Sequence, residues 1–190
     1  MSKKSLLLFL LIISIIISNY VVAQDTNQLI IHNRKSFFIE GYIGTQVSGI
    51  RKEDYVKTNF SPYIQISAGK ILSQSISVNI NFQGPYFNYI GDNHKHNYQF
   101  VGSEMIINIK NLLKKNKSNY WDLYLFTGPG VLFNNYLNKT NLCISGGIIN
   151  EYKIQTFSLM LKISAIGGFK IYQHDKDILT NLSLGLCKYF

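Results

Sequence analysis

The sequence is poor in the residues that mark several common protein classes. Its 190 residues include 2 cysteines, 3 prolines and 1 tryptophan, and charged residues make up 15%. Two cysteines cannot form a disulfide scaffold, and neither lies in a CxxC motif or a Cys/His cluster, so a structural zinc site is excluded. The low charge and the 46% hydrophobic content exclude a disordered tail, a coiled coil and a basic nucleic-acid-binding arm. The remaining possibility is one domain rich in Tyr and Phe, a composition that favours strands.

The N-terminus has the pattern of a secretory signal peptide. Lys3 and Lys4 precede an apolar run over residues 6–17, and a short segment of small and modest side chains ends at Ala23. We expect cleavage between Ala23 and Gln24. An uncleaved membrane anchor is the alternative, but the strictly apolar run is shorter than the ~20 residues that a spanning helix needs. The sequence therefore predicts a signal peptide over residues 1–23 and export of the rest of the chain.

The exported part shows repeated two-residue alternation of apolar and polar side chains and no convincing helical stripe. The cleanest example runs from Ile76 to Gln83, with apolar residues on one face and polar residues on the other. This pattern is typical of a strand with one dry and one wet face. Strands are predicted over residues 37–49, 62–72, 76–83, 99–109, 121–132, 142–152, 161–172 and 181–190.

An even number of strands in an exported chain of this size predicts a closed barrel. We expect an all-β fold, an eight-stranded antiparallel up-and-down transmembrane β-barrel over residues 37–190, after a polar lead over residues 24–36. The connections support alternating long loops and short turns. The segments Arg51–Asn59 and Gly84–Tyr98 read as long polar loops, whereas Ser73–Ser75 reads as a tight turn.

Alternation alone does not tell a membrane barrel with an apolar outside from a soluble, lipocalin-like barrel that binds an apolar ligand inside. A soluble barrel needs Lys and Glu along its outer faces, but the polar faces here consist mainly of Ser, Asn, Gln, Gly and Tyr. We therefore predict that the apolar faces contact lipid and lipopolysaccharide in the bacterial outer membrane. The charges on the predicted strands are few: Glu40, Lys70, Glu104, Asp122, Glu151, Lys162, Lys170 and Lys188.

The C-terminal strand resembles the signal by which the barrel-assembly machinery recognises outer-membrane proteins. It ends on an aromatic residue and alternates apolar with small or polar side chains. Lys188 departs from the pattern, which prefers an apolar or aromatic residue there. The residues that carry the signal are Leu182, Leu184, Leu186 and Phe190.

Two internal segments resemble the N-terminal barrel of OmpA-type outer-membrane proteins. The segment SPYIQISAGKILSQSISVNINFQG (Ser61 to Gly84) looks like the second strand, inner turn and third strand of that family, and DLYLFTGPGVLF (Asp122 to Phe133) looks like its fifth. The resemblance implies an eight-stranded membrane barrel. Family members often carry a peptidoglycan-binding domain after the barrel. Because this sequence stops at the last predicted strand, we do not expect tethering to the cell wall.

The ionisable residues predicted to face the lumen are the main candidates for a functional site. Charges removed from water are costly unless they are paired, so we expect carboxylate–ammonium pairs across the barrel. An eight-stranded barrel is just wide enough for its own side chains to fill, which favours a packed polar plug. A gated leak for small solutes is the alternative. The predicted lumen charges are Glu40, Glu104, Asp122, Lys162 and Lys170.

The histidines and cysteines indicate no further chemistry. His94 and His96 lie near Asp92, but no third ligand is evident, so we expect no metal and no cofactor. Barrel enzymes that edit lipid A need a histidine on or beside a strand, close to a serine and a carboxylate, and all four histidines lie outside the predicted strands. Cys143 and Cys187 are predicted on the inner face of strands that are not neighbours. We expect two free thiols, with a bridge across the lumen as the alternative.

The expected function is structural or interactive rather than enzymatic. The barrel would anchor polar extracellular loops, which are the expected contact for any extracellular ligand, although no loop motif identifies one. We expect a monomer, and no nucleic-acid partner because no nucleic-acid-binding signature is present. A minor, porin-like channel is the alternative.

Overall fold

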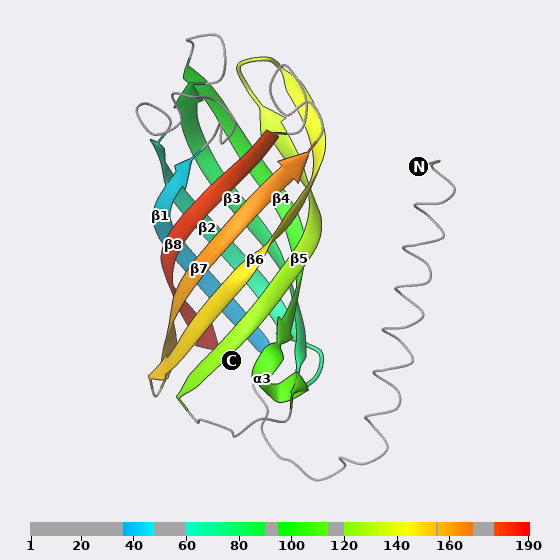
Figure 1. Cartoon of the computed structure of the whole chain (residues 1–190), viewed down its shortest axis with the longest axis vertical. Helices are drawn as coiled ribbons and strands as arrows, with labels where there is room; N and C mark the ends of the chain where they lie inside the picture. Colours follow the sequence, from blue (N-terminus) through cyan, green and yellow to red (C-terminus); the bar gives the residue numbers. More distant parts are fainter. Residues whose placement is uncertain (1–35, 48–59, 90–94, 114–119, 155, 169–176) are drawn as a thin grey trace, which may run out of the picture. The chain divides into compact units, whose positions relative to one another are not determined.

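Each strand of the structure pairs antiparallel with its neighbours in the sequence, and the first strand pairs with the last. The structure, a computed structural model, describes residues 36–47, 60–89, 95–113, 120–154, 156–168 and 177–190. The described residues form a closed barrel of eight tilted strands (Figure 1), as the sequence predicts. The strands are β1 (Phe37–Val47), β2 (Phe60–Ile71), β3 (Ile76–Tyr89), β4 (Lys95–Asn108), β5 (Trp121–Asn134), β6 (Lys139–Ile154), β7 (Phe157–Gly168) and β8 (Asp177–Tyr189).

The apolar faces of the strands form the outside of the barrel. On β2, Ile64 and Ile66 are exposed, whereas Tyr63, Gln65 and Ser67 between and beside them are buried in the lumen. The same alternation of exposed apolar and buried polar side chains holds along the other strands. This arrangement confirms the predicted direction of the faces, and it contradicts the soluble barrel with an apolar interior.

The prediction of a long polar loop over Gly84–Tyr98 is wrong. β3 continues to Tyr89 and β4 begins at Lys95, so only residues 90–94 separate the two strands. The ladder shifts register between Gln83 and Tyr86, where Gly84 has a φ of 113°. This bulge interrupts the two-residue period, and the alternation used to find the strand stops there although the pairing resumes.

Other strand boundaries also differ from the predicted ones. β7 begins at Phe157 rather than at residue 161, β8 begins at Asp177 rather than at residue 181, and β6 is longer at both ends than predicted. The predicted ends of the first strand at residue 49 and of the seventh at residue 172 lie outside the described residues. The signal peptide, its cleavage site and the loop Arg51–Asn59 lie outside them as well.

One end of the barrel carries two short turns and both ends of the barrel chain (Figure 1). The predicted turn over Ser73–Ser75 is present: the backbone N–H groups of Leu72 and Ser73 both donate to the Ile76 carbonyl at 3.0 Å. A short helix, α3 (Ile109–Leu112), follows β4 at the same end, and the Asn108 side chain caps it. We refer to this end as the turn end and to the opposite one as the loop end. Among the described residues, no helix is long and apolar enough to cross a membrane.

Candidate functional site

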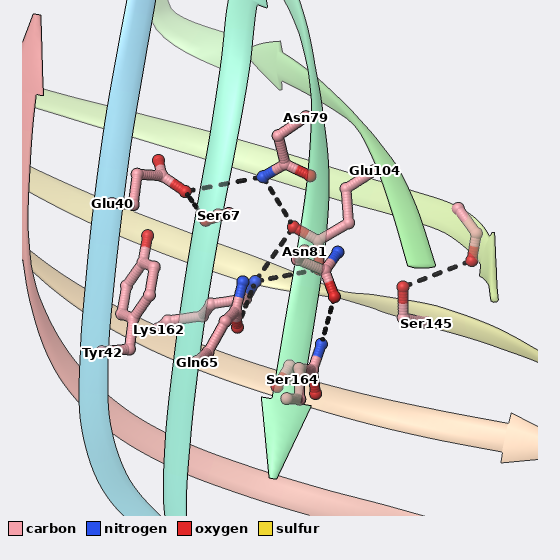
Figure 2. A network of polar contacts seen from close by, with 12 residues as sticks. Glu40, Tyr42, Gln65, Ser67, Asn79, Asn81, Glu104, Ser145, Lys162 and Ser164 are labelled. Atoms are coloured by element: carbon pink, nitrogen blue, oxygen red, sulfur yellow. Dashed lines mark hydrogen bonds and ion pairs between the residues drawn. The ribbon is translucent and has the colours of Figure 1, made fainter. Parts of the chain in front are cut away.

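The lumen holds an ion pair between two strands that are not neighbours, β4 and β7 (Figure 2). Lys162 of β7 donates from Nζ to Glu104 Oε1 at 2.9 Å and to Oε2 at 3.0 Å. It also donates to Gln65 Oε1 on β2 at 3.1 Å. Both charged side chains have an exposed fraction of 0%. The pair therefore links three strands across the lumen.

Aromatic rings complete the surroundings of the Lys162 ammonium group. Its Nζ lies 4.1 Å from the centroid of the Phe126 ring and 5.3 Å from that of Tyr42. A cation over an aromatic face is attracted by the ring quadrupole, most strongly where water is excluded. The rings and Glu104 together compensate the lysine for the loss of its hydration.

Glu40 belongs to the same cluster but has a different set of partners. Its Oε2 accepts from Ser67 Oγ at 2.8 Å and from Asn79 Nδ2 at 3.5 Å. Asn79 Nδ2 also donates to Glu104 Oε2 at 3.1 Å, so one amide bridges the two carboxylates (Figure 2). Among the described residues, no cation forms an ion pair with Glu40 within 4.0 Å. We refer to Glu40, Glu104, Lys162, Asn79 and Gln65 as the lumen cluster.

Three tyrosines fill the lumen on the loop side of this cluster. The ring centroids of Tyr63 and Tyr86 are 6.0 Å apart, and those of Tyr86 and Tyr98 are 4.9 Å apart. Tyr86 donates to Gln83 Oε1 and Tyr98 to Gln46 Oε1, both at 2.9 Å. All three rings are buried. This layer of rings packs in the lumen between the lumen cluster and the loop end.

A second acidic group is buried in the lumen towards the turn end. Glu151 of β6 is fully buried and accepts from Tyr124 at 2.5 Å and from Tyr189 at 2.8 Å. Glu151 is not among the residues predicted to face the lumen, although the parity of β6 indicates it: Glu151 lies an even number of residues from the inward-facing Cys143.

The structure brings together only part of the predicted charge set. Glu40, Glu104 and Lys162 meet in the lumen cluster. Asp122 lies apart at the turn end, where it pairs with Lys153 at 2.5 Å and lies 4.0 Å from Lys110. Lys170, the fifth residue of the predicted set, lies outside the described residues.

Both cysteines are free and buried. They belong to β6 and β8, which are not neighbours in the barrel. Cys143 and Cys187 therefore form no bridge, as expected, and the alternative of a disulfide across the lumen is wrong.

One histidine departs from its predicted place. His96 belongs to β4, not to a loop, because the strand begins earlier than the alternation indicated. His32, His94 and His174 lie outside the described residues, as does Asp92. Within the described ranges, no three His, Cys, Asp or Glu side chains come close enough together to hold a metal ion.

The residues of the predicted assembly signal all lie on the outer surface of β8 or just beyond it. Leu182, Leu184, Leu186 and Phe190 each expose half or more of their surface. Exposure towards the outside is compatible with recognition by another protein before insertion, and the signal itself stays a prediction.

Comparison with known proteins shows which fold the chain shares. No family model matches the sequence, and no curated protein does. Among solved structures, Neisserial surface protein A superimposes with a TM-score of 0.63 at 12% identity, covering 81% of this chain and 97% of that one. The chain has the fold of an OmpA-type outer-membrane β-barrel. The N-terminal β-barrel domain of Pseudomonas aeruginosa OprF is similar at a TM-score of 0.50 and 11% identity, covering 81% of this chain and 98% of that one.

The surface of the barrel independently indicates that the protein lies in a membrane. Large apolar side chains cover the outside of every strand, and the ionisable groups of the lumen cluster are shielded within. A surface of this kind is stable in lipid, and closing the sheet removes the unpaired edges that lipid would not tolerate. The protein is therefore a membrane-spanning barrel of the bacterial outer membrane.

Proposed function

We propose that the protein is a sealed outer-membrane barrel with a structural or surface-interaction role, in which the barrel anchors extracellular loops. The observation that supports this is the filled lumen. The tyrosine layer, the Glu104–Lys162 pair and the Glu151 layer succeed one another along the barrel, and their key side chains are almost completely buried. A lumen in which polar groups bind one another offers no continuous water path.

The proposal includes an orientation and the partners that go with it. Outer-membrane barrels keep short turns in the periplasm and longer loops outside, so the turn end faces the periplasm. The signal peptide is removed between Ala23 and Gln24, and the barrel-assembly machinery inserts the protein as a monomer. Lipid and lipopolysaccharide surround the apolar wall, and an extracellular ligand would contact the loop end. The engagement of the buried polar groups with one another favours a non-enzymatic role.

The full chain in a planar lipid bilayer is expected to give no steady conductance. The physical reason is the burial of Lys162 and Glu104 in the lumen, where ions would have to displace an intact ion pair. A known porin in the same bilayer is the positive control. Stable openings of the unmodified protein would contradict the sealed barrel.

A minor channel for small solutes is the second candidate, and two features of the lumen favour it. Glu40 and Glu104 face a single lysine in the lumen cluster, so the carboxylates exceed the cations. Gln65 Nε2 and Asn81 Nδ2 are buried atoms without a hydrogen-bond partner, and such atoms are suitable sites for ordered water. In the bilayer experiment, brief openings whose frequency changes in Glu104→Lys would support this candidate over the sealed barrel.

Thiol labelling in intact cells is expected to confirm the orientation. Asn135→Cys places an exposed thiol in the loop-end turn after β5, and Gln74→Cys places one in the turn before β3. A membrane-impermeant maleimide should label the first variant and leave the second unlabelled until the cells are lysed. The native Cys143 and Cys187 are buried and provide the unlabelled background. The opposite labelling pattern would reverse the orientation.

A further inference from the structure

Two lysines and two phenylalanines form a patch on the outside of the barrel where β2, β1 and β8 meet. Phe37 pairs with Lys70 across β1 and β2. Phe37 and Phe190 exchange backbone hydrogen bonds, from Phe190 N to Phe37 O at 2.8 Å and from Phe37 N to Phe190 O at 3.4 Å. Lys188 precedes Phe190 by two residues, so both project from the same face of the strand. We call Lys70, Phe37, Phe190 and Lys188 the seam patch.

Each lysine of the seam patch lies over an aromatic ring. Lys70 Nζ is 5.6 Å from the centroid of the Phe37 ring, and Lys188 Nζ is 5.3 Å from that of Phe190. All four side chains are exposed. The two cation–π pairs lie next to each other, because Phe37 and Phe190 are joined by backbone hydrogen bonds.

The seam patch lies at the edge of the apolar wall. Towards the middle of the barrel, Ile39 follows Phe37 on the same face and pairs with Lys188, and Leu186 precedes Lys188 on β8. Towards the other side the strands end. Lysines at such a boundary keep their stems on apolar surface and extend their charges to the headgroup region.

The two lysines of the seam patch have no ion-pair partner among the described residues. Neither Lys70 nor Lys188 forms an ion pair within 4.0 Å with any described carboxylate. Among the other described lysines at the turn end, Lys110 and Lys153 differ because both lie beside Asp122. Two lysines that have no ion-pair partner within 4.0 Å among the described residues, placed at a membrane boundary, are complementary to a phosphate group.

We propose that the seam patch binds the phosphate of an anionic phospholipid in the inner leaflet, with the acyl chains along the wall formed by Ile39 and Leu186. The inference rests on the membrane location and on the orientation proposed above. Lys70 and Lys188 donate to the phosphate oxygens as point charges from two sides. The rings of Phe37 and Phe190 hold the ammonium groups at headgroup height.

Native mass spectrometry of the full chain with mixed lipids tests the proposal. The unmodified protein should retain phosphatidylglycerol in preference to phosphatidylcholine, and Lys70→Gln with Lys188→Gln should lose this preference. A lysine near an anionic surface contributes about fivefold in binding, so the pair is expected to contribute roughly 25-fold. The double arginine variant at the two positions should keep the preference, because it keeps both charges.

A charge-matched double variant is the control. The double variant Lys139→Gln, Lys153→Gln loses the same net charge as the seam variant. Lys139 lies at an exposed strand end and Lys153 is paired with Asp122. The preference of this variant for phosphatidylglycerol should remain. The proposal would be overturned if the seam variant kept the preference or if the control lost as much. Displacement of the lipid by inorganic phosphate alone would also overturn it, since the site would then bind a free anion.

A folding assay separates failure of this inference from failure of the proposed function. In phosphatidylcholine vesicles, both the unmodified protein and the seam variant should migrate compactly in cold SDS and shift on boiling. With that shift present, a missing lipid preference rejects only the seam patch. A protein that fails to insert and shows no shift rejects the membrane barrel itself.

Discussion

Lys162→Met is expected to lower the free energy of unfolding by about 3–5 kcal/mol, because it leaves the Glu104 carboxylate in the lumen without its cation. Methionine preserves most of the apolar stem that packs beside Phe126, so the change removes the charge with little change in volume. Urea unfolding of the barrel in phosphatidylcholine vesicles measures the effect. The chain contains 1 tryptophan, Trp121, whose fluorescence reports the transition.

Two further variants show whether the loss comes from an unpaired charge. Lys162→Met combined with Glu104→Gln should recover most of the stability, because replacing both members of a buried pair is often nearly neutral. Lys153→Met removes an ion pair whose lysine side chain is 43% exposed, and its cost should stay below about 1 kcal/mol. If Lys162→Met cost no more than Lys153→Met, the lumen would be hydrated and the sealed barrel would be wrong.

The sequence predicts which residues face lipid because a strand allows only two faces. Once Ile76–Gln83 is assigned as a strand, each apolar residue shares one face and each polar residue the other. The same parity predicts that Glu104 and Lys162 point inward, as they do. This parity also predicts that Glu151 points inward. The position is hard to recognise in the sequence because the alternation of β6 is weak around Gly146 and Gly147.

The partners inside the lumen are not predictable in the same way. Glu104 and Lys162 come from β4 and β7, and which inward side chains meet depends on strand tilt and on the stagger around the barrel. Neither quantity is encoded in local alternation. The bulge after Gln83 shifts the register of β3 against β4, which moves every later side chain relative to its neighbours. Asp122 is the second residue of β5 and so lies at the turn end, where it pairs with Lys153 instead of joining the lumen cluster.

Replacing a lumen-facing glycine that packs against an aromatic ring is expected to cause the second large loss of stability. Gly102 of β4 and Gly130 of β5 pair directly, and the Phe100 ring covers both. A Cβ added at Gly130 would lie 2.2 Å from Phe100 Cζ and 2.8 Å from the Val101 carbonyl oxygen. A Cβ added at Gly102 would lie 2.6 Å from the nearest ring atom of Phe100. The nearest backbone atom, the Pro129 oxygen, would be 3.2 Å away.

These distances predict different costs at the two glycines. Gly102→Ala should lower the free energy of unfolding by about 1–3 kcal/mol, and Gly130→Ala by an amount at or above the top of that range. Both are measured by urea unfolding in phosphatidylcholine vesicles. In a Phe100→Leu background, most of the cost of Gly102→Ala should disappear, because the ring is the closest obstacle and the Pro129 oxygen at 3.2 Å requires only a small shift. The cost of Gly130→Ala should fall only in part, because the Val101 carbonyl remains.

Gly41→Ala is the matched control for these glycine variants. Gly41 lies on the outer face of β1, and a Cβ there meets no atom within 4 Å. Its stability should be unchanged or slightly higher, since alanine restricts the unfolded chain more than glycine does. Equal losses at Gly41, Gly102 and Gly130 would mean that backbone freedom, not ring packing, sets the cost. Losses confined to the inward positions would instead support a lumen filled by its own side chains, on which the sealed barrel depends.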